Sequence, residues 1–174
     1  MHPYLGPVAG LLVALAWTDV AAQQPACTLL TPADIETITG AKAMEPHPLN
    51  MTIPEGPQKG QPMNGCMWGV AGNGMVSVST MPYPKDVSPE DMAKLEQVYG
   101  ELKAQQWTQE RKDFPGGSCS IMTPPPSKKD SPILSGCITQ AKGMVISSSF
   151  MSPTVKLSMD QTRALMDKAV SRMH

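Results

Sequence analysis

Apolar and polar residues alternate in two stretches of the chain, and each stretch predicts a β-hairpin. The first runs from Cys66 to Val78 around a glycine-rich turn at residues 71–74. The second runs from Ile133 to Met151, and its turn at residues 140–143 suits a type I turn closed by a glycine bulge. Ser118–Thr123 predicts a further strand. Because successive side chains of a strand point to opposite faces, this pattern indicates a sheet with one buried face.

Three segments begin with the residues that favour a helix N-terminus. Thr31 and Ser88 are each followed by proline and have an acidic residue three positions later, and Ser158 is followed three positions later by Gln161. A hydroxyl at the N-cap accepts a hydrogen bond from the otherwise unpaired amides of the first turn. We therefore expect three helices, at residues 31–40, 88–106 and 158–173.

These elements predict an α+β fold in the order α-β-β-α-β-β-β-α. Antiparallel sheet with the helices packed on one face is the expected architecture. If residues 1–22 are removed as a signal peptide, residues 23–174 remain, which is enough for one domain with a single core.

An apolar run at the N-terminus predicts export. It extends from Leu5 to Trp17 without a charged residue, and small residues follow at Val20–Ala22. This is the layout of a signal peptide cleaved after Ala22, and the run is shorter than the about 20 residues that a membrane span needs. Gln24 stands where the signal of a lipoprotein carries a leucine-like residue. We therefore expect a periplasmic or secreted protein without a stable membrane anchor.

The four cysteines agree with export. No two of them are spaced as Cys-x-x-Cys, so they lack the spacing of zinc sites and redox enzymes; they are Cys27, Cys66, Cys119 and Cys137. An oxidising compartment favours two disulfides, for which three pairings exist. If the strands around Cys119 and Cys137 pair antiparallel, those two cysteines face each other and Cys27 pairs with Cys66.

The chain contains 14 methionines, and most of them fit apolar positions in place of scarce aromatic residues. The segment at residues 43–64 is different, because it is rich in proline and glycine and predicts a long loop. Its Met44, His47 and Met51 carry thioethers and an imidazole, which are soft ligands that suit Cu(I). A copper site, a partner-binding loop and a connection without function are the three interpretations of this loop.

Charge and motifs exclude several classes of function. The net charge is −1, which gives no basic field for nucleic acid. After signal-peptide cleavage the histidines are His47, which lies between two prolines, and His174, which ends the sequence. No nucleophile motif, phosphate-binding loop or dinucleotide fingerprint occurs. We expect no catalytic residues and no cofactor other than the alternative of copper.

Cys27-Thr28-Leu29-Leu30-Thr31, with a helix after it and Cys66-Met67-Trp68 further on, resembles a group of small exported bacterial proteins and lipoproteins of unknown function. In that group a Cys-x-Leu-Leu-Thr helix precedes a Cys-x-Trp strand. The resemblance implies a shared α+β fold and a Cys27–Cys66 disulfide, and it implies no activity.

The sequence thus favours an exported, methionine-rich and non-enzymatic protein that binds a protein or small ligand. The alternatives are a Cu(I)-binding protein that uses Met44, His47 and Met51, and an enzyme whose site has no recognisable motif.

Overall fold

Seven strands form one antiparallel sheet in the computed structural model, which describes residues 25–54, 59–83, 89–128 and 130–174. The strands lie in the order β1-β2-β3-β7-β6-β5-β4. Their bounds are β1 Ala43–Thr52, β2 Pro62–Val70, β3 Gly74–Pro82, β4 Thr108–Phe114, β5 Gly117–Thr123, β6 Ile133–Ala141 and β7 Met144–Ser152. The expected signal peptide and the predicted N-cap Ser88 lie outside the described residues.

The three predicted helices are present as α1 (Pro32–Thr39), α2 (Pro89–Ala104) and α3 (Met159–Ser171). Thr31 is the N-cap of α1 and Ser158 that of α3. Each forms a reciprocal capping box with the side chain three residues later. Short 3₁₀ turns, η1 (Ala26–Thr28) and η2 (Pro126–Lys128), complete the helical elements that the described residues form.

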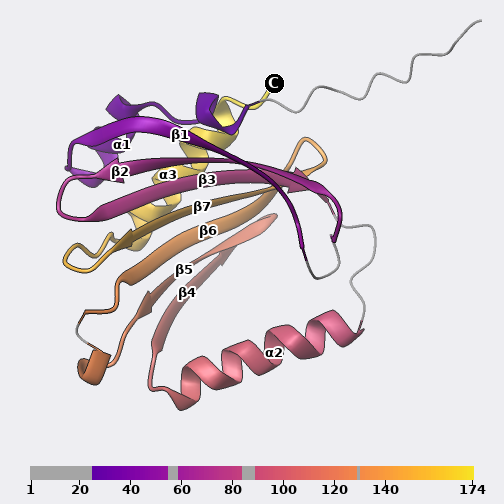
Figure 1. The fold of residues 1–174 in the computed structure, drawn as a ribbon, viewed down its shortest axis with the longest axis vertical. Coiled ribbons are helices and arrows are strands. Elements are labelled where there is room, and N and C mark those ends of the chain that lie inside the picture. Colours follow the sequence, from indigo (N-terminus) through magenta and orange to yellow (C-terminus); the bar gives the residue numbers. More distant parts are fainter. Residues whose placement is uncertain (1–24, 55–58, 84–88, 129) are drawn as a thin grey trace, which may run out of the picture.

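One face of the sheet carries the core. Side chains that alternate along the inner strands are buried against η1, α1 and α3, which lie together behind the strands in Figure 1. We call this the helix face and its opposite the open face. The core side chains on and above the helix face include Trp68, Val76, Val78, Ile146, Phe150, Leu29, Leu30, Ile35, Leu157, Leu165 and Met166.

Both disulfides belong to this core. Cys27–Cys66 joins η1 to β2, and Cys119–Cys137 joins directly paired residues of β5 and β6. The pairing agrees with the one expected from antiparallel strands around Cys119 and Cys137. All four sulfurs lie on the helix face, so the disulfides hold the covered side of the sheet and leave the open face to other side chains.

The expected element order is wrong by two strands, and both are edge strands. Residues 43–64, expected to form a loop, contain β1 and the start of β2. Pro46 and Pro48 hide β1 in the sequence, because proline cannot donate to a ladder and is tolerated only where one side of the strand is unpaired. At the other edge, β4 carries charged and polar side chains almost throughout, which protects an edge from further pairing but removes its apolar alternation.

Two further expectations need correction. The β6–β7 turn has positive φ at both Lys142 and Gly143, which is the backbone of a type I′ turn rather than a type I turn with a bulge. The helices also do not all pack on one face: α2 lies along the β4 side of the sheet, apart from α1 and α3 (Figure 1). At β4 the helix face is already covered by α3, because the Arg163 guanidinium carbon lies 3.5 Å from the centre of the Phe114 ring.

Asp34 fastens α1 to α3. Its carboxylate accepts hydrogen bonds from the backbone and side chain of Thr31 and from the Arg172 guanidinium at the end of α3, and Lys168 Nζ lies 3.5 Å away. Burial alone would raise the pKa of Asp34, but the hydrogen bonds from Arg172 and Thr31 and the charge of Arg172 lower it to about 2. The ionised carboxylate is therefore favoured by folding.

Replacing Asp34 by Asn should destabilise the fold at neutral pH by about 2 kcal/mol, because the pKa difference between the unfolded and folded states is close to two units. A carboxylate with a lowered folded-state pKa contributes fully above the unfolded value, and its contribution is lost as the pH falls from about 4 to about 2. Urea melts of wild type and Asp34→Asn should converge over that window. Asp167→Asn, which breaks an exposed pair with Arg163, is the control and should cost little. A pH-independent gap between wild type and Asp34→Asn would contradict this account.

The two disulfides should differ in their contribution to stability. Their sequence separations are 39 residues for Cys27–Cys66 and 18 for Cys119–Cys137. Closing the longer loop restricts the unfolded chain more, so paired Cys→Ala changes should cost about 4 and about 3 kcal/mol respectively. Urea melts of the two double variants test the order. A smaller loss for the pair at 27 and 66 would contradict the loop-closure explanation.

Candidate functional site

Small side chains form a band across the middle of the open face. Ser77 on β3 is hydrogen-bonded to Ser149 on β7, and Ser79 to Ser147, each with 2.7 Å between the hydroxyl oxygens. Gly136 of β6 lies next to Ser149 in the register. A Cβ on Gly136 would come within 2.8 Å of the Ser148 carbonyl oxygen, so close strand packing requires glycine here. The middle of the open face therefore carries only short side chains and is weakly polar.

Methionines surround this band. Strand register places the side chains of eight methionines on the open face, opposite to the buried residues that alternate with them: Met44, Met51, Met63, Met67, Met75, Met81, Met122 and Met151. Met44, Met51 and Ile138 are among the large apolar side chains that the described residues expose most. Several apolar side chains gathered on one face mark a binding face more often than single scattered ones do.

A cavity of about 490 Å³ opens where α2 meets the β4–β5 end of the open face. Leu102 and Lys103 come from the last turns of α2, and Trp107 follows the helix. Gln109 and Arg111 of β4 and Met122 of β5 complete the lining. An indole, a thioether and an isobutyl group thus surround the same space as two cations and an amide.

Local interactions orient the polar groups of this cavity. Arg111 Nε donates to the Asp113 carboxylate at 2.8 Å, two residues along the same face of β4. The last turn of α2 is followed by Gln106, whose φ of 60° turns the backbone so that Trp107 N–H donates to the Leu102 carbonyl oxygen at 3.1 Å. The indole Nε1 of Trp107 is buried and has no hydrogen-bond acceptor among the described residues. The polar character of the cavity therefore comes from Gln109 and from the cations Lys103 and Arg111, and Arg111 already pairs with Asp113.

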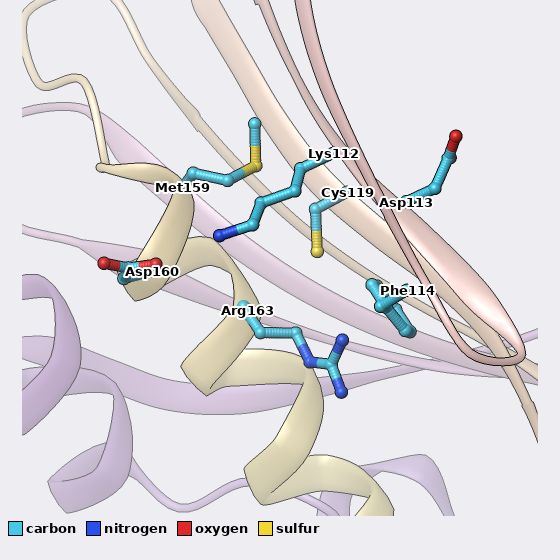
Figure 2. A pocket seen from close by; sticks show the side chains of 7 residues that line it. All are labelled: Lys112, Asp113, Phe114, Cys119, Met159, Asp160 and Arg163. Atoms are coloured by element: carbon cyan, nitrogen blue, oxygen red, sulfur yellow. The ribbon is translucent and has the colours of Figure 1, made fainter.

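A smaller cavity of about 120 Å³ lies on the helix face, between β4–β5 and α3. Figure 2 shows Lys112 and Arg163 extending from the two sides across the space in front of the Cys119 sulfur, with Met159 and Asp160 on α3. Asp113 points away from it, toward its partner on the open face (Figure 2). Arg163 is held by Phe114 and by Asp167, so this cavity belongs to the packing of α3 on β4.

A third cavity, of about 530 Å³, follows the groove between α1 and α3. The charged groups that line it are paired with charged groups of the two helices: Asp34 with Arg172 and Lys168, and Asp167 with Arg163. These contacts account for the groove as the junction of two helices. The α2–β4–β5 cavity, whose walls combine an indole, a thioether and an isobutyl group with its cations, is the better candidate site.

Met44, His47 and Met51 all lie on the open face of β1, but the structure does not bring them together. His47 is paired with Met67 and Met51 with Met63, while Met44 lies over Gly69. At about 3.3 Å per residue, Met44 and Met51 are roughly 23 Å apart along the strand. One ion cannot be shared by both ends of this set. No group of three or more His, Cys, Asp or Glu side chains in the described part of the chain is placed to hold a metal.

The cavity residues carried little signal in the sequence. Trp107, Gln109 and Arg111 lie at alternate positions on one face of the chain, but two of the three are polar and so are the residues between them, so no apolar period appears. No helix in the described ranges is long and apolar enough to cross a membrane.

Comparison with known proteins gives a fold and no family. No family model and no curated protein sequence matches the chain. Among solved structures, the chain is similar to the extracellular domain of PknH from Mycobacterium tuberculosis. The TM-score is 0.55 and the identity 13%, over 88% of this chain and 96% of that domain. At this identity the likeness shows a shared fold, and the chain is therefore built on the same architecture as an extracellular domain.

Proposed function

We propose that the chain is an exported binding domain without catalytic activity, whose ligand is an organic anion with an apolar body. The observation that carries the proposal is the α2–β4–β5 cavity, where Lys103 and Arg111 lie beside Leu102, Trp107 and Met122. Cavities with mostly apolar walls and a few convergent polar groups are the usual form of small-ligand sites. Lys103 and Arg111, whose guanidinium also contacts Asp113, match the negative charge of the ligand, and the apolar walls match its body.

Export is supported by three independent features. All four cysteines form disulfides, which persist in oxidising compartments. The N-terminal apolar run has the layout of a signal peptide. A solved structure with a similar fold is itself an extracellular domain. A periplasmic or secreted location for this chain follows from these features as part of the proposal.

The open face extends the cavity toward the rest of the sheet. Met122 lines the cavity and is paired with Leu134 on β6, which is paired in turn with Met151 on β7. An apolar ligand body that leaves the cavity therefore meets apolar side chains on the next two strands. Methionine suits this role because its flexible, polarisable side chain adapts to ligands of different shape.

Laurate, a carboxylate with an alkyl chain, is a suitable probe, with dodecanol as its uncharged analogue. Laurate should shift the emission of Trp107 to shorter wavelength, because its alkyl chain displaces water from the indole. The change should disappear in Trp107→Phe, since Trp68 is fully buried on the other face. Arg111→Met should weaken laurate binding roughly 10- to 100-fold through loss of a charge-assisted hydrogen bond. Dodecanol binding should change little in the same variant.

Arg163→Met is the matched control, because it removes an arginine from the helix-face cavity and should leave laurate binding unchanged. Equal binding of laurate and dodecanol would refute the assignment of an anionic ligand. If laurate gives no signal that depends on Trp107, the cavity is not the ligand site.

A further inference from the structure

Three methionines lie on neighbouring positions of the open face, at the side of the sheet away from α2. Met75 on β3 and Met151 on β7 are direct partners in the register, so their Cβ atoms lie about 5 Å apart. Both side chains are partly exposed. They face solvent on the open face, since Val76 and Phe150 next to them are buried in the core.

Met44 lies next to this pair because the neighbouring position on β2 is a glycine without a side chain. Gly69 of β2 is the direct partner of Met75, and Met44 Sδ lies 3.0 Å from the position that a Cβ on Gly69 would occupy. The side chain of Met44 therefore fills the place on β2 next to Met75. The register of Met75 and Met151 and the position of Met44 over Gly69 thus put three sulfur-bearing side chains in one row across β2, β3 and β7.

We propose that Met44, Met75 and Met151 form a binding site for a soft monovalent cation of the class of Cu(I) and Ag(I). Thioethers are soft, neutral ligands that select such ions over hard cations such as Mg²⁺ and Ca²⁺. Each methionine side chain has three rotatable bonds, so the sulfurs can converge on an ion without moving the strands. Met44 is 61% exposed, which leaves the row open to an ion from solvent.

This site shares only Met44 with the set predicted from the sequence. His47 is paired with Met67 in the neighbouring row, and Met51 lies at the far end of β1. The site shares no lining residue with the α2–β4–β5 cavity, although Met151 also borders the path proposed for the ligand body. Silver binding and laurate binding are measured separately, so either proposal can fail while the other holds.

Titration of the mature, oxidised protein with Ag(I), followed by calorimetry, tests the site. The described residues hold no free cysteine, so thiolates do not compete for silver. Wild type should bind one equivalent, and Met44→Leu, Met75→Leu and Met151→Leu combined should abolish this binding. Leucine keeps the apolar volume, so the melting temperature of the metal-free protein should stay the same. Survival of silver binding in the triple variant would overturn the proposal.

The control is the triple change Met51→Leu, Met63→Leu and Met67→Leu, which removes three other thioethers from the same face. This variant and His47→Ala should both bind silver like wild type. If either of them loses the binding, the ion is held elsewhere on β1 and β2 and the assignment is wrong.

Gly69→Val tests the role of the missing side chain. The three nearest atoms to a new Cβ at Gly69 all belong to the flexible Met44 side chain, and valine suits a strand, so the fold should be kept. Displacing the Met44 sulfur should weaken silver binding roughly 10- to 100-fold. Wild-type affinity in Gly69→Val would show that Met44 is not a ligand.

Discussion

The packing of η1, α1 and α3 against one face of the antiparallel sheet is the constraint on which the other features of the molecule depend. Side chains of a strand alternate between two faces, so covering one face fixes which residues enter the core and which remain outside. Cys27–Cys66 holds the entry to α1 on β2, and Asp34 holds α1 to the end of α3. With this layer fixed, the methionines and serines of the same strands lie together on the open face.

The two ends of the open face then offer different chemistry. At the β4–β5 end, α2 brings Lys103 and Leu102 to the aromatic and cationic side chains of the edge strand, which suits an anion with an apolar body. Toward β1, the row of Met44, Met75 and Met151 carries no charge and suits a soft cation. Beside the methionine row, on β3 and β7, serine hydroxyls satisfy each other's hydrogen bonds, so this part of the open face offers few polar groups to either ligand.

The parts of the fold that depend on local chemistry were predictable from the sequence. Capping residues at Thr31 and Ser158 and the alternation around Trp68 identify helices and inner strands, because the residues that decide these elements lie within a few positions of each other. The edge strands were not predictable in the same way. Prolines in β1 and charges in β4 protect the sheet edges and, for the same reason, remove the apolar period.

The candidate sites depend on register, which links residues far apart in the chain. Met75 and Met151 are direct partners across β3 and β7, and Trp107 meets Met122 only because β4 pairs with β5. The sequence suggested that most methionines fill the core. That holds for Met166, but not for the methionines that alternate with buried strand residues. The position of α2 could not be predicted from its own residues either, because it depends on which face of the sheet the other helices occupy.

The central claim is that ligands bind to the open face and not to the helix layer. Methionine methyl groups report on both surfaces, with Met122 and Met151 on the open face and Met159 and Met166 on α3. A methionine-methyl NMR titration with laurate tests the claim most directly. The account predicts the largest shift at Met122, a smaller one at Met151, and no change at Met159 and Met166. Shifts confined to Met159 and Met166 would contradict it.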